Sequence, residues 1–179
     1  MEISELRQCK TLYLDRDGVI NKRIIDGYVR NTNEFIFEDG VLDAMKIFAH
    51  LFEHIFIVSN QQGIGKGLMT EDDLKNVHKY MTDNIVDAGG FITKVYFCPF
   101  LTSLKHVDRK PDIGMALQSK HDYPDVIFRK SIMVGDAVSD IAFGRHLNMK
   151  TVSINLDDGV ADLNFGRLKD FADFMEKIN

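Results

Sequence analysis

The sequence contains few cysteines and prolines and no tryptophan. Its two cysteines, Cys9 and Cys98, are too few for a disulfide framework, and such a low number suits a reducing cytoplasm. The three prolines are scattered, and no internal repeat or low-complexity linker divides the 179 residues. This length is sufficient for one domain with a substantial core. We therefore predict a single domain, residues 1–179, located in the cytoplasm.

Positive charge and long apolar runs are also scarce. Lys+Arg number 22 against 27 for Asp+Glu, which gives a formal net charge of −5. A chain without a basic excess lacks the electrostatic signature of a nucleic-acid-binding protein. No apolar run is long enough to span a membrane, and the first ten residues lack the basic-then-apolar pattern of a signal peptide. We expect a monomer whose partner is a small molecule rather than a membrane or nucleic acid.

Short apolar runs alternate with segments of helical period along the chain. Strands are predicted at residues 11–14, 54–60, 91–97, 131–135 and 150–154. Helices are predicted at residues 41–52, 70–88, 111–121, 138–147 and 168–178. This alternation predicts an α/β protein with a Rossmann-like, three-layer α/β/α fold and a mostly parallel central sheet. The segments between strands are too short for a separate cap domain.

Two carboxylates follow the first predicted strand. Asp15 and Asp17 are one residue apart and precede Gly18. Side chains at i and i+2 of an extended backbone leave on the same side, so these like charges need a cation or a shared proton. Of these two, the sequence favours a Mg²⁺ ion, because Mg²⁺ binds oxygen ligands and keeps positions open for water and phosphate.

Polar residues also lie at the ends of later strands or in the adjacent loops. They are Ser59, Asn60, Lys110, Asp136 and Asp140. The carboxyl ends of parallel strands meet at one edge of a sheet, so we expect these side chains to share a pocket with Asp15 and Asp17. The set supplies a carboxylate nucleophile, a carboxylate for proton transfer, another for Mg²⁺, a hydroxyl donor and a fixed positive charge. That inventory is typical of phosphoryl transfer through an aspartyl-phosphate intermediate.

Four short motifs resemble, in order, those of the haloacid-dehalogenase (HAD) superfamily of phosphatases. They are Asp15-Arg-Asp17-Gly-Val-Ile, Ser59-Asn60, Arg109-Lys110-Pro111 and Gly135-Asp136-x-x-x-Asp140. The resemblance covers nearly the whole chain. It looks most like the branch that contains D,D-heptose 1,7-bisphosphate and histidinol-phosphate phosphatases. It implies a Mg²⁺-dependent hydrolase of small phosphorylated metabolites, with a sugar phosphate as the leading substrate.

The resemblance also implies a role for each carboxylate. Asp15 would attack phosphorus, and Asp17 would protonate the leaving alcohol and then activate the hydrolytic water. Mg²⁺ would be held by Asp15, the backbone carbonyl of Asp17 and Asp136. Asp140 would orient Lys110 or the metal-bound waters.

The remaining matched residues would bind the substrate. Ser59 and Asn60 would donate hydrogen bonds to the phosphate, and Lys110 would neutralise its charge. The positions that contact substrate in the heptose branch correspond here to Asp26, Gly27, Tyr28 and Arg109.

The sequence departs from the branch at two places. Its members commonly carry a zinc loop, Cys-x-His followed by Cys-x-Cys, before Arg-Lys-Pro. Here Cys98 is kept, but Phe100, His106 and Asp108 occupy the other places, so we expect no structural zinc. Ala137 stands where heptose phosphatases have a substrate-binding lysine. Both differences leave the identity of the substrate open.

Other functions are weighed against this one. A histidinol-phosphate phosphatase and a nucleic-acid 3′-phosphatase would use the same chemistry, although the acidic balance disfavours the latter. A signalling receiver module would end its third strand in the acceptor aspartate, whereas the corresponding strand here ends in Ser59 and Asn60. A catalytically silent binding protein is disfavoured, because it would have no structural need for Asp15, Asp17, Lys110 or Asp136.

Two further expectations concern residues outside these motifs. The histidines show no metal-ligand spacing, and we expect a surface position for His50, His54, His78, His121 and His146. The acidic turn Asp157-Asp158-Gly159 is expected to be a loop after the fifth strand.

Overall fold

Six strands form one sheet in the computed structural model, which describes residues 3–156 and 159–179. All neighbouring strands are parallel, and their order is β3-β2-β1-β4-β5-β6. The strands are β1 (Thr11–Leu14), β2 (His54–Asn60), β3 (Lys94–Cys98), β4 (Ser131–Gly135), β5 (Lys150–Ile154) and β6 (Leu163–Phe165). The acidic turn predicted at Asp157 and Asp158 lies outside the described residues. Because β1 lies between β2 and β4, the segments that follow these three strands are neighbours.

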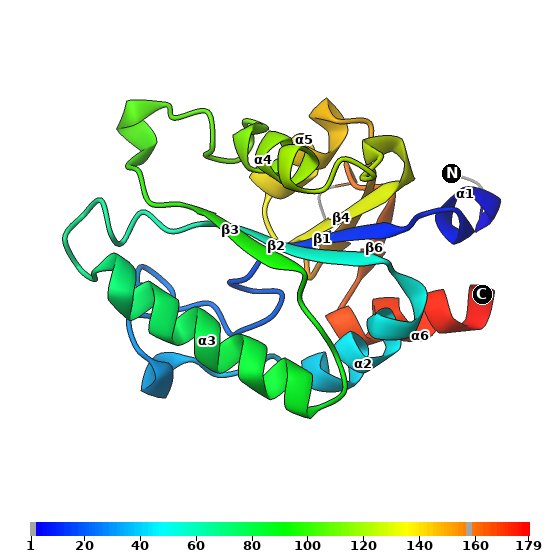
Figure 1. Ribbon diagram of the computed structural model, residues 1–179, viewed down its shortest axis with the longest axis horizontal. Helices are drawn as coiled ribbons and strands as arrows, with labels where there is room; N and C mark the ends of the chain where they lie inside the picture. Colours follow the sequence, from blue (N-terminus) through cyan, green and yellow to red (C-terminus); the bar gives the residue numbers. More distant parts are fainter. Residues whose placement is uncertain (1–2, 157–158) are drawn as a thin grey trace.

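Helices cover both faces of the sheet and complete three layers (Figure 1). One face carries α2 (Val41–Leu51), α3 (Glu71–Asp87) and α6 (Leu168–Ile178), with α1 (Ile3–Arg7) in contact with α6. The opposite face carries α4 (Gly114–Asp122) and α5 (Val138–His146). Short 3-10 helices occur at Thr32–Glu34, Thr102–Leu104 and Phe128–Lys130. This architecture confirms the predicted fold class.

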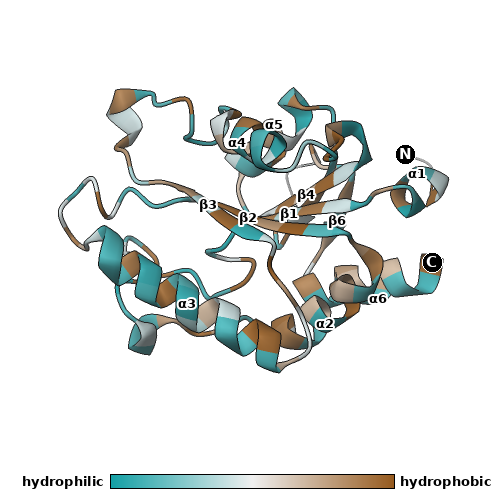
Figure 2. Cartoon of the chain, in the orientation of Figure 1, coloured by the Kyte–Doolittle hydropathy of each residue, from teal (hydrophilic) through white to brown (hydrophobic). Residues whose placement is uncertain are grey.

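Alternating side chains of the strands fill two separate cores. Leu12 and Leu14 of β1 belong to the apolar cluster beneath α2, α3 and α6. Tyr13 points the other way and packs with Phe56 and Phe143 on the side of α4 and α5. A strand buried on both faces has few polar positions, which explains the continuous apolar runs in the sequence. Figure 2 shows this apolar character in the strands, whereas much of α3 is hydrophilic.

Most predicted elements lie where the sequence places them, but two begin later. The third strand begins at Lys94 instead of residue 91, because Phe91 and Ile92 pack against the core before the pairing starts. Helix α4 begins at Gly114 instead of residue 111. The amides of Asp112 and Gly114 bond to the carbonyls of Arg109 and Val107, so a turn occupies the residues before the helix.

Two short elements, α1 and β6, are not predicted from the sequence. They contain five and three residues, which is too short for a periodic pattern to stand out. Among the described residues only loops extend over the carboxyl ends of the strands, and no separate cap domain is present. No described helix has the length and apolar character needed to cross a membrane.

Candidate active site

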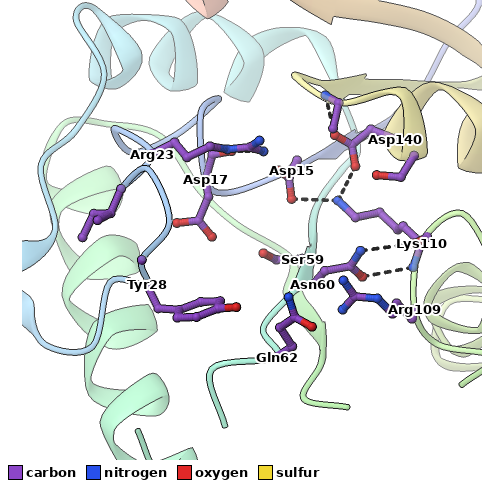
Figure 3. A pocket seen from close by; sticks show the side chains of 14 residues that line it. Asp15, Asp17, Arg23, Tyr28, Ser59, Asn60, Gln62, Arg109, Lys110 and Asp140 are labelled. Carbon is purple, nitrogen blue, oxygen red and sulfur yellow. Dashed lines mark hydrogen bonds and ion pairs between the residues drawn. The ribbon is translucent and has the colours of Figure 1, made fainter. Parts of the chain in front are cut away.

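A cavity of about 290 Å³ lies beyond the carboxyl ends of β1, β2 and β4. Most of the predicted site residues line it together, although they come from four separate parts of the chain (Figure 3). These predicted residues are Asp15, Asp17, Gly27, Tyr28, Ser59, Asn60, Arg109, Lys110 and Asp140. Arg23, Ile24, Gln62, Ala137 and Ser139 complete the lining. The convergence of strand ends therefore brings the predicted set together.

Asp15 belongs to a buried ion triad at the centre of this site. Its backbone amide continues the ladder by bonding to Val134 O at 2.9 Å. Lys110 Nζ lies 2.7 Å from Asp15 Oδ1 and 2.7 Å from Asp140 Oδ1. Burial raises the pKa of Asp15 to about 6, although the charge of Lys110 opposes this rise. Burial lowers the pKa of Lys110, but Asp140 and Asp15 outweigh it, so the pKa rises overall and the lysine stays charged.

Asn60 fixes the backbone that carries the lysine. Its Nδ2 donates to Lys110 O at 3.1 Å, and its Oδ1 accepts from Lys110 N at 3.0 Å. The sequence predicts that Asn60 donates to phosphate, but here both ends of the amide contact the Lys110 peptide. This pairing holds the loop before α4 against the end of β2. One amide hydrogen of Asn60 is left for a ligand.

Gln61 links Ser59 to Asp17 and was not predicted as a site residue. This buried side chain donates from Nε2 to Ser59 Oγ and to Asp17 Oδ2, each at 2.8 Å. Because Ser59 accepts this bond, its own hydroxyl hydrogen can be donated into the cavity. That orientation fits the phosphate-donor role predicted for Ser59. The glutamine directly after the Ser59-Asn60 motif is the only sequence signal for it.

Arg16 and Asn21 hold the carboxylate of Asp17. Arg16 Nη2 and Asn21 Nδ2 donate to Asp17 Oδ1 at 2.9 and 3.0 Å. Burial raises the pKa of Asp17, but the charge of Arg16 and the hydrogen bonds outweigh it, and the pKa falls below its usual value. Asp17 is therefore ionised at neutral pH. The arginine between the two aspartates of the motif is the sequence signal for this contact.

The Arg16 guanidinium is fully buried and uses His78 as a second partner. Arg16 Nη1 lies 3.2 Å from His78 Nε2, and the ring of His78 meets that of Phe97 at a centroid distance of 5.9 Å. Burial, followed by the charge of Arg16, lowers the pKa of His78 to about 3. The imidazole is therefore neutral and accepts from the arginine. The predicted surface position of His78 is wrong, because residue 78 falls on the same helical face as Leu74 and Val77.

Replacing His78 with leucine is expected to lower the free energy of unfolding by about 1–3 kcal/mol, because it leaves a buried guanidinium hydrogen without an acceptor. The variant His78→Gln provides an amide oxygen in the same place and should recover part of the loss. Urea unfolding at pH 7 measures both variants. Equal stability of the leucine and glutamine variants would contradict this role of the Arg16–His78 contact.

Asp136 completes a group of carboxylates suited to a cation. One oxygen of each of Asp15, Asp136 and Asp140 can be chosen so that all lie within 4.8 Å of one another. A Cβ at Gly18 would lie 1.9 Å from Asp136 Oδ2, and Gly18 has a φ of +91°, so only glycine fits beside this carboxylate. Burial and the charge of Asp15 raise the pKa of Asp136 to about 7. This donor set of carboxylate oxygens fits Mg²⁺.

The metal-free protein is expected to lose stability as the pH rises from about 4 to 7. Asp15 and Asp136 have folded-state pKa values of about 6 and about 7, both above their usual value of 3.8. The fold therefore favours their neutral forms, and ionisation through these pKa values costs stability. For Asp136 the rise corresponds to at most about 4 kcal/mol. Urea unfolding with a chelator tests this, and a stability that does not fall between pH 4 and 7 contradicts it.

The predicted substrate positions divide between two adjoining cavities. Gly27, Tyr28 and Arg109 line the cavity with the carboxylates. Asp26 is exposed and lines only the neighbouring cavity, which shares Gly27 and Tyr28 with the first. Lys66 Nζ lies 5.2 Å from the ring centroid of Tyr28. A substrate that extends beyond its reacting phosphate therefore has space along Tyr28 towards Asp26.

The loop of residues 98–108, which lacks the zinc-ligand spacing of related enzymes, is stabilised by an aromatic contact. The rings of Phe100 and His106 stack with centroids 4.0 Å apart, and the amide of Asp108 donates to His106 Nδ1 at 3.2 Å. The guanidinium of Arg109 reaches back to Phe100 O at 3.4 Å. The stacked rings thus support the segment that presents Arg109 and Lys110.

Comparisons with known proteins agree with this geometry. The family model described as Polynucleotide kinase 3 phosphatase matches residues 12–173. The D-glycero-alpha-D-manno-heptose-1,7-bisphosphate 7-phosphatase of Mycobacterium bovis is 34% identical over 168 residues, which are 90% of this chain and 88% of that protein. The enzyme of the same name from Campylobacter jejuni is 33% identical over 171 residues, which are 94% of this chain and 96% of that protein.

A solved structure supports the same fold. The D,D-heptose 1,7-bisphosphate phosphatase from B. bronchiseptica, complexed with magnesium and phosphate, has a TM-score of 0.86 and 24% identity. The match covers 95% of this chain and 99% of that one. With the family model and the curated relatives, this likeness confirms the family predicted from the four motifs. The chain belongs to the HAD superfamily of phosphatases.

Proposed function

We propose that this phosphatase hydrolyses a phosphorylated heptose, with D-glycero-D-manno-heptose 1,7-bisphosphate as the leading substrate and the 7-phosphate as the group removed. The observation that carries the proposal is the buried triad of Asp15, Lys110 and Asp140 beside Ser59, whose hydroxyl accepts from Gln61 and keeps its own hydrogen for the phosphate. Relatives named as heptose-1,7-bisphosphate 7-phosphatases support the substrate class. The adjoining cavities along Tyr28 leave room for a sugar beyond the reacting phosphate.

The first chemical step uses Asp15 as the nucleophile. A carboxylate oxygen of Asp15 attacks phosphorus, and the bond from phosphorus to the sugar oxygen breaks. Lys110 and the Ser59 hydroxyl bind the phosphoryl oxygens and hold phosphorus in line with Asp15. Asp140 keeps Lys110 charged and in place, because it binds the same ammonium group at 2.7 Å.

Asp17 transfers protons in both steps. It gives a proton to the leaving sugar oxygen, and it later takes a proton from the water that attacks the aspartyl phosphate. That attack breaks the bond between phosphorus and Asp15 and releases phosphate. Because Arg16 favours the ionised form of Asp17, the proton for the first step enters with the substrate, whose phosphate carries it as a monoanion.

Mg²⁺ would be held by Asp15, the carbonyl oxygen of Asp17 and Asp136. When bound, it neutralises phosphate charge and stabilises the charge that develops during transfer. Arg109 lines the cavity and would contact the substrate. Ala137 contributes no charge there, so fewer cations surround the substrate than a lysine at that position would provide.

Phosphate release from a panel of compounds tests the proposal. The panel contains the α and β anomers of heptose 1,7-bisphosphate, histidinol phosphate, other sugar phosphates and a 3′-phosphorylated oligonucleotide. Each is assayed with Mg²⁺, with chelator and with Asp15→Asn. Hydrolysis of heptose bisphosphate that requires Mg²⁺ and Asp15 is expected. Turnover that survives Asp15→Asn would contradict the covalent mechanism.

A nucleic-acid 3′-phosphatase is the second candidate, because the matching family model is described as Polynucleotide kinase 3 phosphatase. The net charge of −5 weakens this candidate, since binding to a phosphate backbone depends on positive charge. Faster hydrolysis of the oligonucleotide than of any sugar phosphate would favour it over the heptose substrate.

A further inference from the structure

The guanidinium of Arg23 contacts two of the oxygens that the proposed mechanism assigns to Mg²⁺. Its Nη2 lies 2.6 Å from Asp136 Oδ1 and 3.2 Å from the carbonyl oxygen of Asp17. Arg23 belongs to none of the four sequence motifs. Figure 3 shows its side chain extending past Asp17 towards Asp15. A positive group of the chain itself therefore occupies the surroundings in which the cation is expected.

In the metal-free protein, Arg23 neutralises the charge of Asp136. Lys110 pairs with Asp15 and Asp140, and Arg16 pairs with Asp17. Within the described part of the chain, Arg23 is the only cation that forms an ion pair with Asp136. The Asp136 side chain is only 14% exposed, so this pairing replaces solvation that the carboxylate has largely lost.

Metal and arginine compete for these oxygens. A guanidinium has no acceptor atom and cannot join the coordination of a metal ion. A divalent cation bound to Asp136 and to the carbonyl of Asp17 would also repel the positive charge of Arg23 beside it. Binding of Mg²⁺ at these oxygens therefore displaces the Arg23 guanidinium from Asp136 and from the Asp17 carbonyl.

Once displaced, the Arg23 side chain can turn into the cavity. Arg23 lies on the loop after β1, and 47% of its side chain is exposed, so it can rotate without disturbing the core. It already lines the cavity, on the same side as Tyr28 and opposite Arg109 and Lys110 (Figure 3). With alanine at position 137, Arg23 is a cation available to an anionic group on that side of the cavity.

We propose that Arg23 exchanges partners during the catalytic cycle. In the metal-free protein it holds Asp136 and the Asp17 carbonyl, and after Mg²⁺ takes these oxygens it binds the second, non-reacting phosphate of the substrate. The second half of this exchange rests on the proposed bisphosphate substrate. The exchange makes metal binding favour the later binding of substrate, because the same event frees a cation for it.

Isothermal titration of the protein with MgCl₂, without substrate, tests the first half. Arg23→Ala is expected to bind Mg²⁺ about threefold to tenfold more tightly than the wild type, because the competing cation is gone. It should also lower the melting temperature of the metal-free protein and leave that of the Mg²⁺-saturated protein nearly unchanged. The neighbouring exposed cation provides a matched control, since Lys22 pairs only loosely with Asp39 at 3.8 Å. Unchanged or weaker Mg²⁺ binding by Arg23→Ala, or an equal gain in Lys22→Ala, overturns the exchange.

Steady-state kinetics at saturating Mg²⁺ test the second half. Arg23→Ala is expected to raise the KM for heptose 1,7-bisphosphate by about tenfold with little change in kcat, because one charged hydrogen bond is lost. The KM for p-nitrophenyl phosphate, which has no second phosphate, should stay the same. An equal effect on both compounds, or none on either, overturns this half. If the wild type hydrolyses p-nitrophenyl phosphate but not the heptose, the proposed substrate is wrong, while the Mg²⁺ titration still decides the first half.

Discussion

Asp15→Asn is expected to lower kcat by about 10⁴-fold or more, because an amide cannot form the aspartyl phosphate. The replacement preserves the size of the side chain and leaves Lys110 paired with Asp140 at 2.7 Å. Loss of turnover would therefore reflect the missing nucleophile rather than a collapsed site. Rates with and without Mg²⁺, together with far-UV circular dichroism, measure activity and folding in the same samples.

A second measurement identifies the intermediate itself. Wild-type protein mixed rapidly with substrate and quenched in acid should carry one phosphoryl group on the peptide that contains Asp15. Asp39→Asn is the matched control, because this carboxylate is 81% exposed and does not line the cavity. It should retain full activity. Labelling of a different residue, or normal turnover by Asp15→Asn, would contradict the covalent mechanism.

Lys110→Met is expected to abolish activity and to lower the free energy of unfolding at pH 7.5 by about 3–5 kcal/mol in the metal-free protein. The substitution removes the shared partner of two carboxylates, Asp15 and Asp140, that are almost completely buried. The charge of Lys110 lowers the pKa of Asp15, so without the lysine that pKa rises further. The penalty is therefore present above this raised pKa and is partly relieved as the pH falls and Asp15 becomes neutral. Urea unfolding at pH 7.5 and pH 5 measures both parts of the expectation.

The same substitution at the surface provides the comparison. Lys79 of α3 pairs with Asp83, and the side chain of Lys79 is 73% exposed. Lys79→Met should change stability by less than about 1 kcal/mol at either pH, because exposed ion pairs contribute little. A loss in Lys110→Met as small as in Lys79→Met would mean that the buried triad does not stabilise the fold.

The fold could be predicted from the sequence because its signals are local. The runs of β1, β2 and β4 are buried on both faces, and such strands are largely apolar and end where polar residues begin. The third strand was placed three residues early because Phe91 and Ile92 are as apolar as a strand. Their burial comes from packing below the sheet, which no local pattern reveals.

The site was predicted in its principal residues but not in its supporting contacts. Asp15, Ser59 and Lys110 carry recognisable chemistry at strand ends, and their positions follow from the parallel sheet. The partners Arg16, Gln61 and His78 could not be derived in this way. Their roles depend on which side chains meet across the loops, and the same residue types are usually found at protein surfaces.

The position of β1 in the middle of the sheet has a consequence for how the enzyme matures. The nucleophile appears early in the chain, at residue 15, but β1 pairs with β4, which begins at Ser131. Asp136 follows that strand, and Lys110 and Asp140 must also be in place before the triad exists. A nascent chain that has not yet extended past β4 and the start of α5 therefore carries the reactive aspartate and Lys110 but lacks Asp136 and Asp140. Phosphatase activity thus requires nearly four-fifths of the sequence, so catalysis reports on the assembly of the central strands around β1.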